Sequence, residues 1–218
     1  MHLSPIEQEI FDDLFSRRPE LKVCSENILE THEILVKCFS SGGTLFTCGN
    51  GGSYADALHI AGELVKSFER KRPLDNDFQN QLLKEYEGEE LRKYFEAGLR
   101  AIPLGMNSAL KTAIENDCPL RDIAFAQELS VLMKSGDVLL AISTSGNAKN
   151  CLYATSVARA KYGTVIGLTG LSGGLLAKYS HVCIKVPGNS TKVIQEGHQS
   201  IWHAICAMVE AHFFTEKR

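Results

Sequence analysis

Five short apolar runs, the first four of them separated from one another by helical stretches, dominate the sequence between residues 44 and 186. A strand that is hydrophobic along its whole length must be covered on both faces, and helical connections between such strands produce a parallel sheet. We therefore expect an α/β fold in which helices sandwich a doubly wound, mostly parallel five-stranded sheet. The five runs are residues 44–48, 101–104, 137–143, 164–169 and 181–186.

Helical patterns precede, separate and follow these runs. Ser4-Pro5-Ile6-Glu7 has the order of an N-cap, a proline at the first helical position and a capping-box glutamate, which predicts a helix to about Phe15. We expect a single domain over 1–218, with residues 1–42 forming extra N-terminal helices and a long helix at the C-terminus. The remaining predicted helices are residues 21–39, 54–68, 108–115, 123–133, 152–162 and 193–214.

One segment interrupts the alternation. Residues 69–100 begin with Glu69-Arg70-Lys71-Arg72 and continue into an acidic run at 84–90. Charge runs of this kind are usually solvated, so we expect this charged insertion to be exposed helix or loop. A regulatory or lid role is the alternative interpretation.

Composition excludes several classes of protein. The chain has 218 residues, 44% of them hydrophobic, which is too apolar for a disordered chain and enough to bury a sizeable core. A net charge of −3 argues against a nucleic-acid partner. No apolar window approaches the length of a membrane span. The first residues lack a basic segment followed by an apolar one, so we expect no secretory signal and a cytoplasmic location.

The cysteines are scattered and contain no C-x-x-C pair, which predicts buried, reduced thiols rather than a disulfide framework or a metal site. They are Cys24, Cys38, Cys48, Cys118, Cys151, Cys183 and Cys206.

Three turns that follow predicted strands are suited to an anion. Gly49-Asn50-Gly51-Gly52-Ser53 leads into a helix, whose N-terminal N–H groups can face a phosphate; a tight turn without a ligand is the alternative. Ser143-Thr144-Ser145-Gly146-Asn147 places three hydroxyls before another helix, and Thr169-Gly170-Leu171-Ser172-Gly173-Gly174 ends the next strand. Hydroxyls and amides can hold a phosphate without a lysine. The turns predict a phosphorylated small molecule.

Nucleotide cofactors are not expected. Tyr54 occupies the place of the third glycine of G-x-G-x-x-G, and the chain contains no Gly-Lys-Ser/Thr sequence for a Walker A loop.

Two groups of polar residues lie on predicted helices. His59 and Glu63 are four residues apart and therefore share a helix face, while Gln195, His198 and His203 lie on the C-terminal helix. The plain alternative for each group is an ordinary, partly buried polar face.

The ordered set of these motifs resembles the phosphoheptose isomerase group of the sugar isomerase (SIS) domain family, over about 44–68 and 101–214. The resemblance implies an aldose–ketose isomerase that converts sedoheptulose 7-phosphate to D-glycero-D-manno-heptose 7-phosphate through an enediol. It also implies a homotetramer with active sites between subunits, and a bound Zn²⁺.

Site residues follow from the resemblance position by position. It implies that Glu63 is the base and that His203 shuttles the second proton. The implied metal ligands are His59, Glu63, Gln195 and His203. The implied substrate- and phosphate-binding residues are Asn50, Gly51, Gly52, Ser53, Ser143, Thr144, Ser145, Asn147 and Gln195.

Helix geometry adds a constraint on the metal. Gln195 and His203 are eight residues apart, about 12 Å along a helix axis, whereas two ligands of one ion lie within roughly 4.5 Å of each other. Either the helix starts after Gln195, or His203 serves a site on a neighbouring chain; we favour the second, a site shared between subunits.

Departures from the family pattern concern the choice of sugar. Asn107 stands where members often have an aspartate, Ala148 replaces a serine, Lys192 replaces an aspartate, and the charged insertion is long. The alternative function is a non-catalytic SIS module that binds a phosphosugar or a protein such as a replication initiator; a nucleotide-dependent enzyme comes third.

The other histidines have no part in this argument. His2, His32, His181 and His212 are expected to be incidental, and His198 is open between a supporting contact and a ligand.

Overall fold

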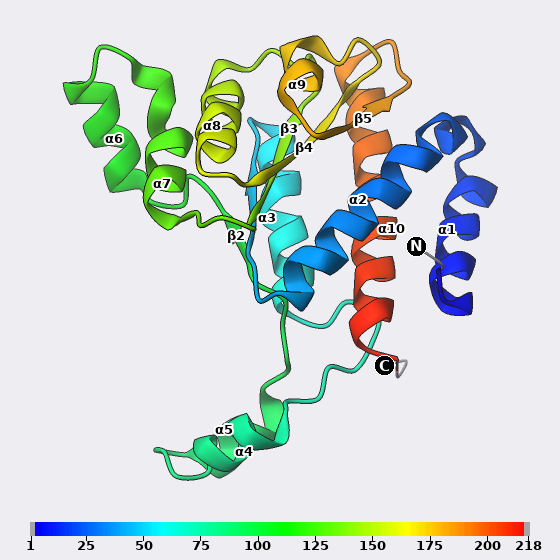
Figure 1. Cartoon of the computed structure of the whole chain (residues 1–218), viewed down its shortest axis with the longest axis vertical. Coiled ribbons are helices and arrows are strands. Elements are labelled where there is room, and N and C mark those ends of the chain that lie inside the picture. Colours follow the sequence, from blue (N-terminus) through cyan, green and yellow to red (C-terminus); the bar gives the residue numbers. More distant parts are fainter. Residues whose placement is uncertain (1–2, 216–218) are drawn as a thin grey trace.

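A five-stranded, wholly parallel sheet lies at the centre of the chain, as predicted, with strand order β2-β1-β3-β4-β5 (Figure 1). The computed structural model describes residues 3–215; His2 and the other residues of 1–2 and 216–218 lie outside that description. The strands are β1 Leu45–Cys48, β2 Ala101–Pro103, β3 Val138–Ser143, β4 Thr164–Gly170 and β5 Val182–Val186.

Helices cover both faces of the sheet, and every predicted helix is present. The predicted helix 21–39 begins as a 3₁₀ helix, Pro19–Cys24, before α2, and α9 was not predicted because its six residues are too few to show a period. The α-helices are α1 Pro5–Arg17, α2 Ser25–Ser40, α3 Gly52–Val65, α4 Asn76–Leu82, α5 Gly88–Tyr94, α6 Ser108–Asp117, α7 Ala124–Leu132, α8 Lys149–Ala160, α9 Gly174–Tyr179 and α10 Thr191–Phe213.

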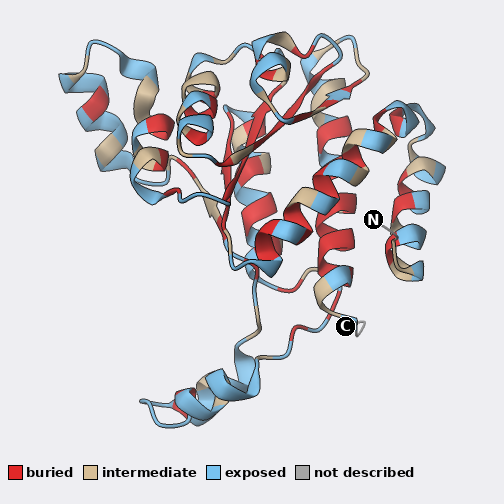
Figure 2. Cartoon of the chain, in the orientation of Figure 1, coloured by how far each residue is buried: buried red, intermediate tan, exposed pale blue. Residues whose placement is uncertain are grey.

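Alternate residues of β3 face two separate cores. Leu140 and Ile142 pack with α1, α2, α3 and α10, whereas Leu139 and Ala141 pack with α7, α8 and α9. Both faces of the strand are therefore buried, which is why its sequence is continuously apolar. Figure 2 shows the buried residues concentrated in the sheet and along α10.

The N-terminal prediction is confirmed in detail. The Glu7 N–H donates to Ser4 Oγ at 3.3 Å, and the Ser4 N–H donates to Glu7 Oε2 at 2.6 Å. This capping box satisfies two N–H groups of the α1 terminus and fixes one oxygen of the Glu7 carboxylate.

No disulfide forms among the cysteines, all of which lie in the described part of the chain. Five are buried, while Cys118 and Cys183 are partly exposed. Among residues 3–215, no helix combines the length and apolar character required to cross a membrane.

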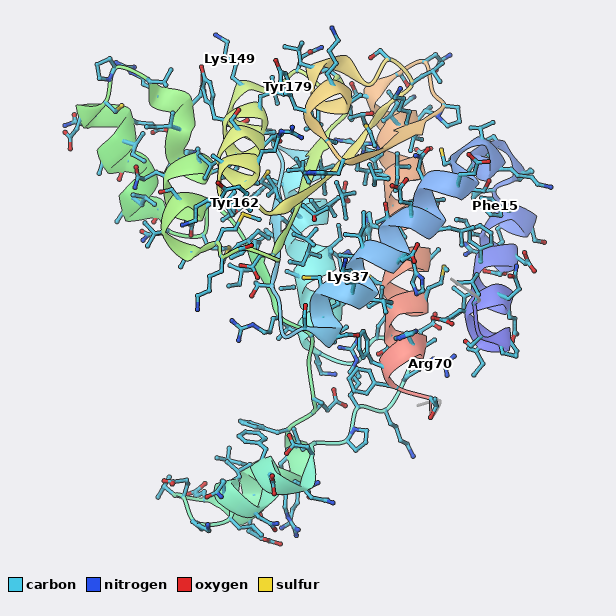
Figure 3. All side chains as sticks on the ribbon, in the orientation of Figure 1. Phe15, Lys37, Arg70, Lys149, Tyr162 and Tyr179 are labelled. Carbon is cyan, nitrogen blue, oxygen red and sulfur yellow. The ribbon has the colours of Figure 1, made fainter. Side chains whose placement is uncertain are left out.

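The charged insertion has two parts with opposite environments. Helices α4 and α5 project from the body on an arm, and their residues are mostly exposed, as expected (Figures 1 and 2). The expectation is wrong for Arg70 and Arg72, which are each only 2% exposed. Arg70 donates to the Thr215 carbonyl and lies beside the end of α10 (Figure 3).

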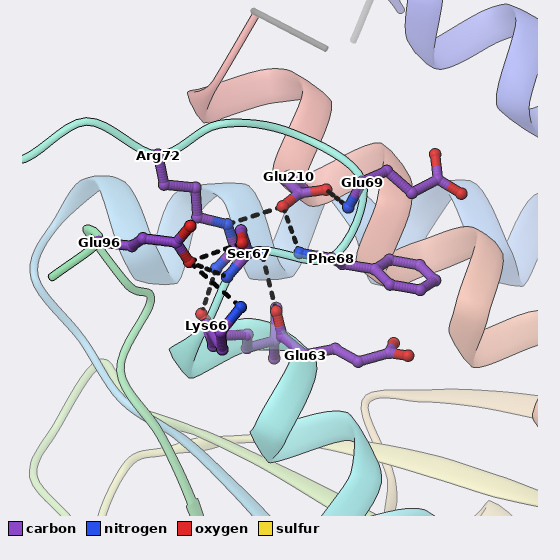
Figure 4. A network of polar contacts seen from close by, with 9 residues as sticks. Glu63, Lys66, Ser67, Phe68, Glu69, Arg72, Glu96 and Glu210 are labelled. Atoms are coloured by element: carbon purple, nitrogen blue, oxygen red, sulfur yellow. Dashed lines mark hydrogen bonds and ion pairs between the residues drawn. The ribbon is translucent and has the colours of Figure 1, made fainter. Parts of the chain in front are cut away.

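Arg72 is buried because every part of its guanidinium has a partner. Its Nε donates to Glu210 Oε1 at 2.7 Å, and its two terminal nitrogens donate to the carbonyls of Leu64 and Glu63 at 2.6 and 2.7 Å (Figure 4). These carbonyls belong to the last turn of α3 and have no partner within the helix. The Arg72 side chain therefore joins the end of α3 to α10.

Glu210 completes this network from the other side. Its two oxygens accept the backbone N–H groups of Phe68 and Glu69 at 2.8 and 2.7 Å (Figure 4). The network thus holds the segment after α3 against α10.

Replacing Arg72 with Met should destabilise the protein by about 3–5 kcal/mol, because Glu210 is then left as a buried charge without its ion-pair partner. Denaturant unfolding at fixed protein concentration measures the change. Lys66→Met is the control, since the exposed pair of Lys66 with Glu96, 3.6 Å apart, is worth under about 1 kcal/mol. Equal stabilities for the two variants would contradict this assignment.

Candidate active site

The first two predicted phosphate turns lie next to each other at the carboxyl edge of the sheet, because β1 and β3 are neighbouring strands. The side-chain amides of Asn50 in the first turn and Asn150 at the start of α8, just after the second turn, make two reciprocal hydrogen bonds of 2.9 and 2.8 Å. Asn50 is therefore where the sequence predicted it, but its amide is engaged by a partner, Asn150, that no motif indicated.

The first turn is shaped by glycines. Gly51 has a φ of +55°, a conformation that glycine adopts without strain, and α3 begins at the next residue. Ser53 is buried in the first turn of α3. A Cβ atom on Gly52 would lie 2.6 Å from Gln195 Nε2, so the Gln195 amide sits directly over this turn.

The second turn uses some of its polar groups to hold its own shape. Ser143 is buried at the end of β3, and Ser145 and Asn147 are exposed. Asn147 donates its N–H to Ser145 Oγ at 3.2 Å, and its side-chain oxygen accepts the Leu175 N–H at 3.0 Å. The side chain of Asn147 thus tethers the turn to α9.

The third turn, after β4, packs against the second. The Gly170 N–H donates to the Thr144 carbonyl at 2.9 Å, and a Cβ on Gly146 would collide with the Gly173 carbonyl. The Thr169 hydroxyl donates to backbone carbonyls and is buried. This turn therefore supports the second turn and offers no free hydroxyl from Thr169.

His59, Glu63 and His203 form one cluster between α3 and α10. Glu63 Oε1 lies 3.2 Å from His59 Nε2 and 3.5 Å from His203 Nε2. One ligand atom from each residue lies within 4.8 Å of the others, an arrangement that can hold a metal ion.

Aromatic rings surround the cluster. The Trp202 ring is centred 4.6 Å from that of His59, and the Phe68 ring stacks on His203 with centroids 5.8 Å apart. No sequence motif pointed to Phe68 or Trp202. They limit how far the two imidazoles can turn.

Helix α10 corrects the predicted geometry of the metal ligands. It begins at Thr191, so the alternative in which the helix starts after Gln195 is wrong. His203 contacts Glu63 of its own chain, while the expectation of a site shared with a neighbouring chain stays a prediction. Gln195 lies about 12 Å from His203 along the axis of α10 and is next to the first phosphate turn instead.

Burial changes the acid–base properties of the cluster. Burial, together with the nearby carboxylates of Glu210 and Glu69, raises the pKa of Glu63 to about 7. Burial also lowers the pKa of His203, with a smaller contribution from His59. A carboxyl group whose pKa lies near neutrality, beside an imidazole whose pKa is lowered, is suited to exchanging protons with a substrate.

Cys206 is a further contact that the sequence interpretation missed. Its thiol lies near the Glu63 carboxylate, and burial together with the Glu63 charge raises the pKa of this thiol, so it stays neutral. It follows His203 by three residues, a helical spacing that could have indicated a shared face.

His203 and the first phosphate turn open onto different cavities. His203 lines a cavity of about 480 Å³ together with Glu9, Asp13 and Arg17 of α1 and with Phe68 and Arg70. The first turn lines another of about 220 Å³, whose other walls include Lys111 and Arg121.

Comparisons with known proteins agree with this geometry. Residues 18–92 and 121–213 each match the profile of the SIS domain. The chain is 40% identical to a phosphoheptose isomerase of Thiobacillus denitrificans, over 82% of this chain and 79% of that one. It is 37% identical to a phosphoheptose isomerase of Rhodospirillum rubrum, over 86% of both chains.

Solved structures give the same result. The phosphoheptose isomerase of Neisseria gonorrhoeae superposes with a TM-score of 0.71 at 30% identity, covering 92% of this chain and 95% of that chain. The sugar isomerase domain of an RpiR transcription factor from Sphaerobacter thermophilus, at 12% identity and a TM-score of 0.54, shares the fold alone.

Gly52→Ala should weaken binding of a sugar phosphate by about three- to tenfold, the value of one hydrogen bond of about 0.5–1.5 kcal/mol, because the new methyl group displaces the Gln195 amide. Isothermal titration calorimetry measures the affinity. Gly62→Ala, on the same helix with nothing within 4 Å of its Cβ, is the matched control and should bind normally. Equal affinities for both variants would show that Gln195 takes no part in binding.

Proposed function

The chain belongs to the phosphoheptose isomerase family of SIS-domain proteins, and we propose on this premise that it interconverts sedoheptulose 7-phosphate and D-glycero-D-manno-heptose 7-phosphate. The observation that carries the proposal is the grouping of His59, Glu63 and His203 on α3 and α10. The same two helices carry Ser53 and Gln195 near their N-terminal ends.

The phosphate group binds at the turns. The hydroxyls of Ser53, Ser143, Thr144 and Ser145 and the N–H groups at the start of α3 supply hydrogen bonds, and the helix dipole favours the negative charge. Asn50 and Asn147 act mainly by holding the two turns in position, because their side chains are bonded within the protein.

Isomerisation requires a proton to move between C1 and C2 and another between their oxygens. Glu63 as a carboxylate removes a proton from C1 of the ketose, which gives an enediol, and the protonated Glu63, after exchange of its proton with solvent, protonates C2. His203 transfers the second proton from the C1 oxygen to the C2 oxygen. Cys206 and the aromatic rings keep Glu63 and His203 in place.

The same three residues suit a zinc ion, because a carboxylate and two imidazoles are typical ligands and Glu63 Oε2 is buried with no hydrogen-bond partner in residues 3–215. His59, Glu63 and His203 would hold the ion, which when bound supplies Lewis acidity towards the substrate oxygens. Gln195 of the same chain is assigned to the substrate instead, since it lies over the first turn.

A non-catalytic SIS module would need the phosphate turns but not this cluster. The presence of all three cluster residues, one of them a carboxyl group with a pKa near 7, favours the enzyme. The unpaired cysteines are consistent with a reducing, cytoplasmic location, which is part of the proposal.

Glu63→Gln should lower kcat by about 10²–10⁴-fold, the usual contribution of a positioned general base, with little change in KM. Isomerisation of sedoheptulose 7-phosphate, followed by NMR, provides the measurement. Glu30→Gln, on the exposed face of α2, is the control for the loss of one negative charge. Turnover at the normal rate would remove Glu63 from the role of base.

We also propose that the complete site is shared between copies of the chain in a homotetramer. The separate cavities of the first phosphate turn and of His203 support sharing, because a second copy can bring the turns of one chain to the cluster of another.

Ser145→Asp chains have phosphate turns that repel the substrate, and Glu63→Gln chains lack the base. Mixing the two should restore activity, because a hybrid oligomer then contains sites with intact turns from one chain and an intact cluster from the other. Hybrid oligomers that exchange subunits, as verified by native mass spectrometry, yet stay inactive would contradict sharing. Each variant alone is the baseline.

A further inference from the structure

A second cluster of metal-binding residues lies away from the active site, where α1, α2 and α10 meet. Glu7 Oε1 lies 3.2 Å from His32 Nε2 and 3.0 Å from His212 Nδ1. One ligand atom from each of the three residues lies within 4.8 Å of the others. His32 and His212 were expected to be incidental, and the fold brings both of them to Glu7 from distant positions in the sequence.

The cluster is largely buried. Glu7 and His32 are 3% and 1% exposed, while the side chain of His212 is 32% exposed and leaves access from solvent. Each polar atom of the buried Glu7 and His32 side chains needs a hydrogen-bond or metal partner, because burying an unsatisfied polar atom costs folding free energy.

His32 lacks such a partner at one nitrogen. The Met208 carbonyl hydrogen-bonds the ring, and Nε2 faces Glu7. Nε2 lies 3.2 Å from Glu7 Oε1 in a poorly aligned contact, and no other group among the described residues hydrogen-bonds it. A metal ion bound to both His32 Nε2 and Glu7 Oε1 would hold these two atoms close together without aligning them for a hydrogen bond.

The neighbouring contacts resemble the support that metal ligands usually have. A carbonyl that holds the second nitrogen of a histidine fixes the ring with its other nitrogen free for a metal. The capping box does the same for Glu7, since Ser4 occupies Oε2 and leaves Oε1 for the cluster.

We propose that Glu7, His32 and His212 bind a zinc ion that joins α1 to α2 and α10. Bonds of about 2.0–2.1 Å in tetrahedral geometry place ligand atoms roughly 3.3 Å apart, close to the observed 3.0 and 3.2 Å. Three protein ligands leave the fourth position to water, which reaches the ion past His212.

Such an ion would stabilise the wall of the active-site cavity. Helix α1 supplies Glu9, Asp13 and Arg17 to the cavity that contains His203, and α1 is otherwise anchored by packing against α10. The zinc would hold this helix in place without touching the substrate.

The test uses the full-length chain, stripped of metal and reloaded with Zn²⁺, in a His59→Gln/His203→Gln background that removes the other metal site. Metal analysis after gel filtration should find one zinc ion per chain, and zinc should raise the melting temperature. Adding Glu7→Gln or His212→Gln should abolish both effects. Gln at position 7 can still accept the Ser4 N–H, so the cap is retained.

Asp12→Asn, on the exposed face of α1, is the matched control for Glu7→Gln and should keep the zinc. Circular dichroism checks that each variant is folded. No zinc in the His59→Gln/His203→Gln background, or zinc that survives both Glu7→Gln and His212→Gln, would overturn the proposal. Neither result bears on isomerisation, which is measured separately with the wild-type chain.

Discussion

The buried ion pair between Arg72 and Glu210 is the interaction on which the geometry of the active site depends. Both side chains are fully buried, and together they bind two carbonyls at the end of α3 and two N–H groups of the segment that follows it. Because α3 carries His59 and Glu63 and α10 carries His203, the pair sets the distance between the two halves of the proton-transfer cluster. Glu210 also acts on the chemistry, since its charge helps to raise the pKa of Glu63.

The parallel sheet provides the other half of the site. Neighbouring strands β1 and β3 end at the same edge, so their turns lie together, and α3 runs from the first turn towards the cluster. Ser53 and His59 are about 9 Å apart along α3, and Gln195 and His203 about 12 Å apart along α10. Each helix thus carries a phosphate-binding end and a proton-transferring end, and in the proposed tetramer the phosphate-binding ends of one chain are completed by the proton-transferring ends of another.

Patterns with a short-range cause were predictable from the sequence. The apolar runs gave the five strands, and Ser4 with Glu7 gave the start of α1, because burial on both faces and capping act within a few residues. The motifs also located Ser53, His59, Glu63 and His203.

Long-range partners were not predictable: Arg72 belongs to a charged run, and its partner Glu210 lies 138 residues away. The contacts of His32, His212 and Asn150 were not predictable for the same reason, because their partners are distant in the sequence. The roles of Gln195 and Asn147 needed the fold as well, because only the packing of α10 and α9 on the turns decides them.

The central claim is that this chain moves a proton between two carbons of a phosphosugar at Glu63. Incubation of the purified protein with sedoheptulose 7-phosphate in D₂O, followed by NMR, tests it most directly. If Glu63 forms an enediol and exchanges its proton with solvent, the aldose that appears should carry deuterium at C2. Binding of the sugar without any isomerisation, or isomerisation without deuterium in the product, would contradict the account.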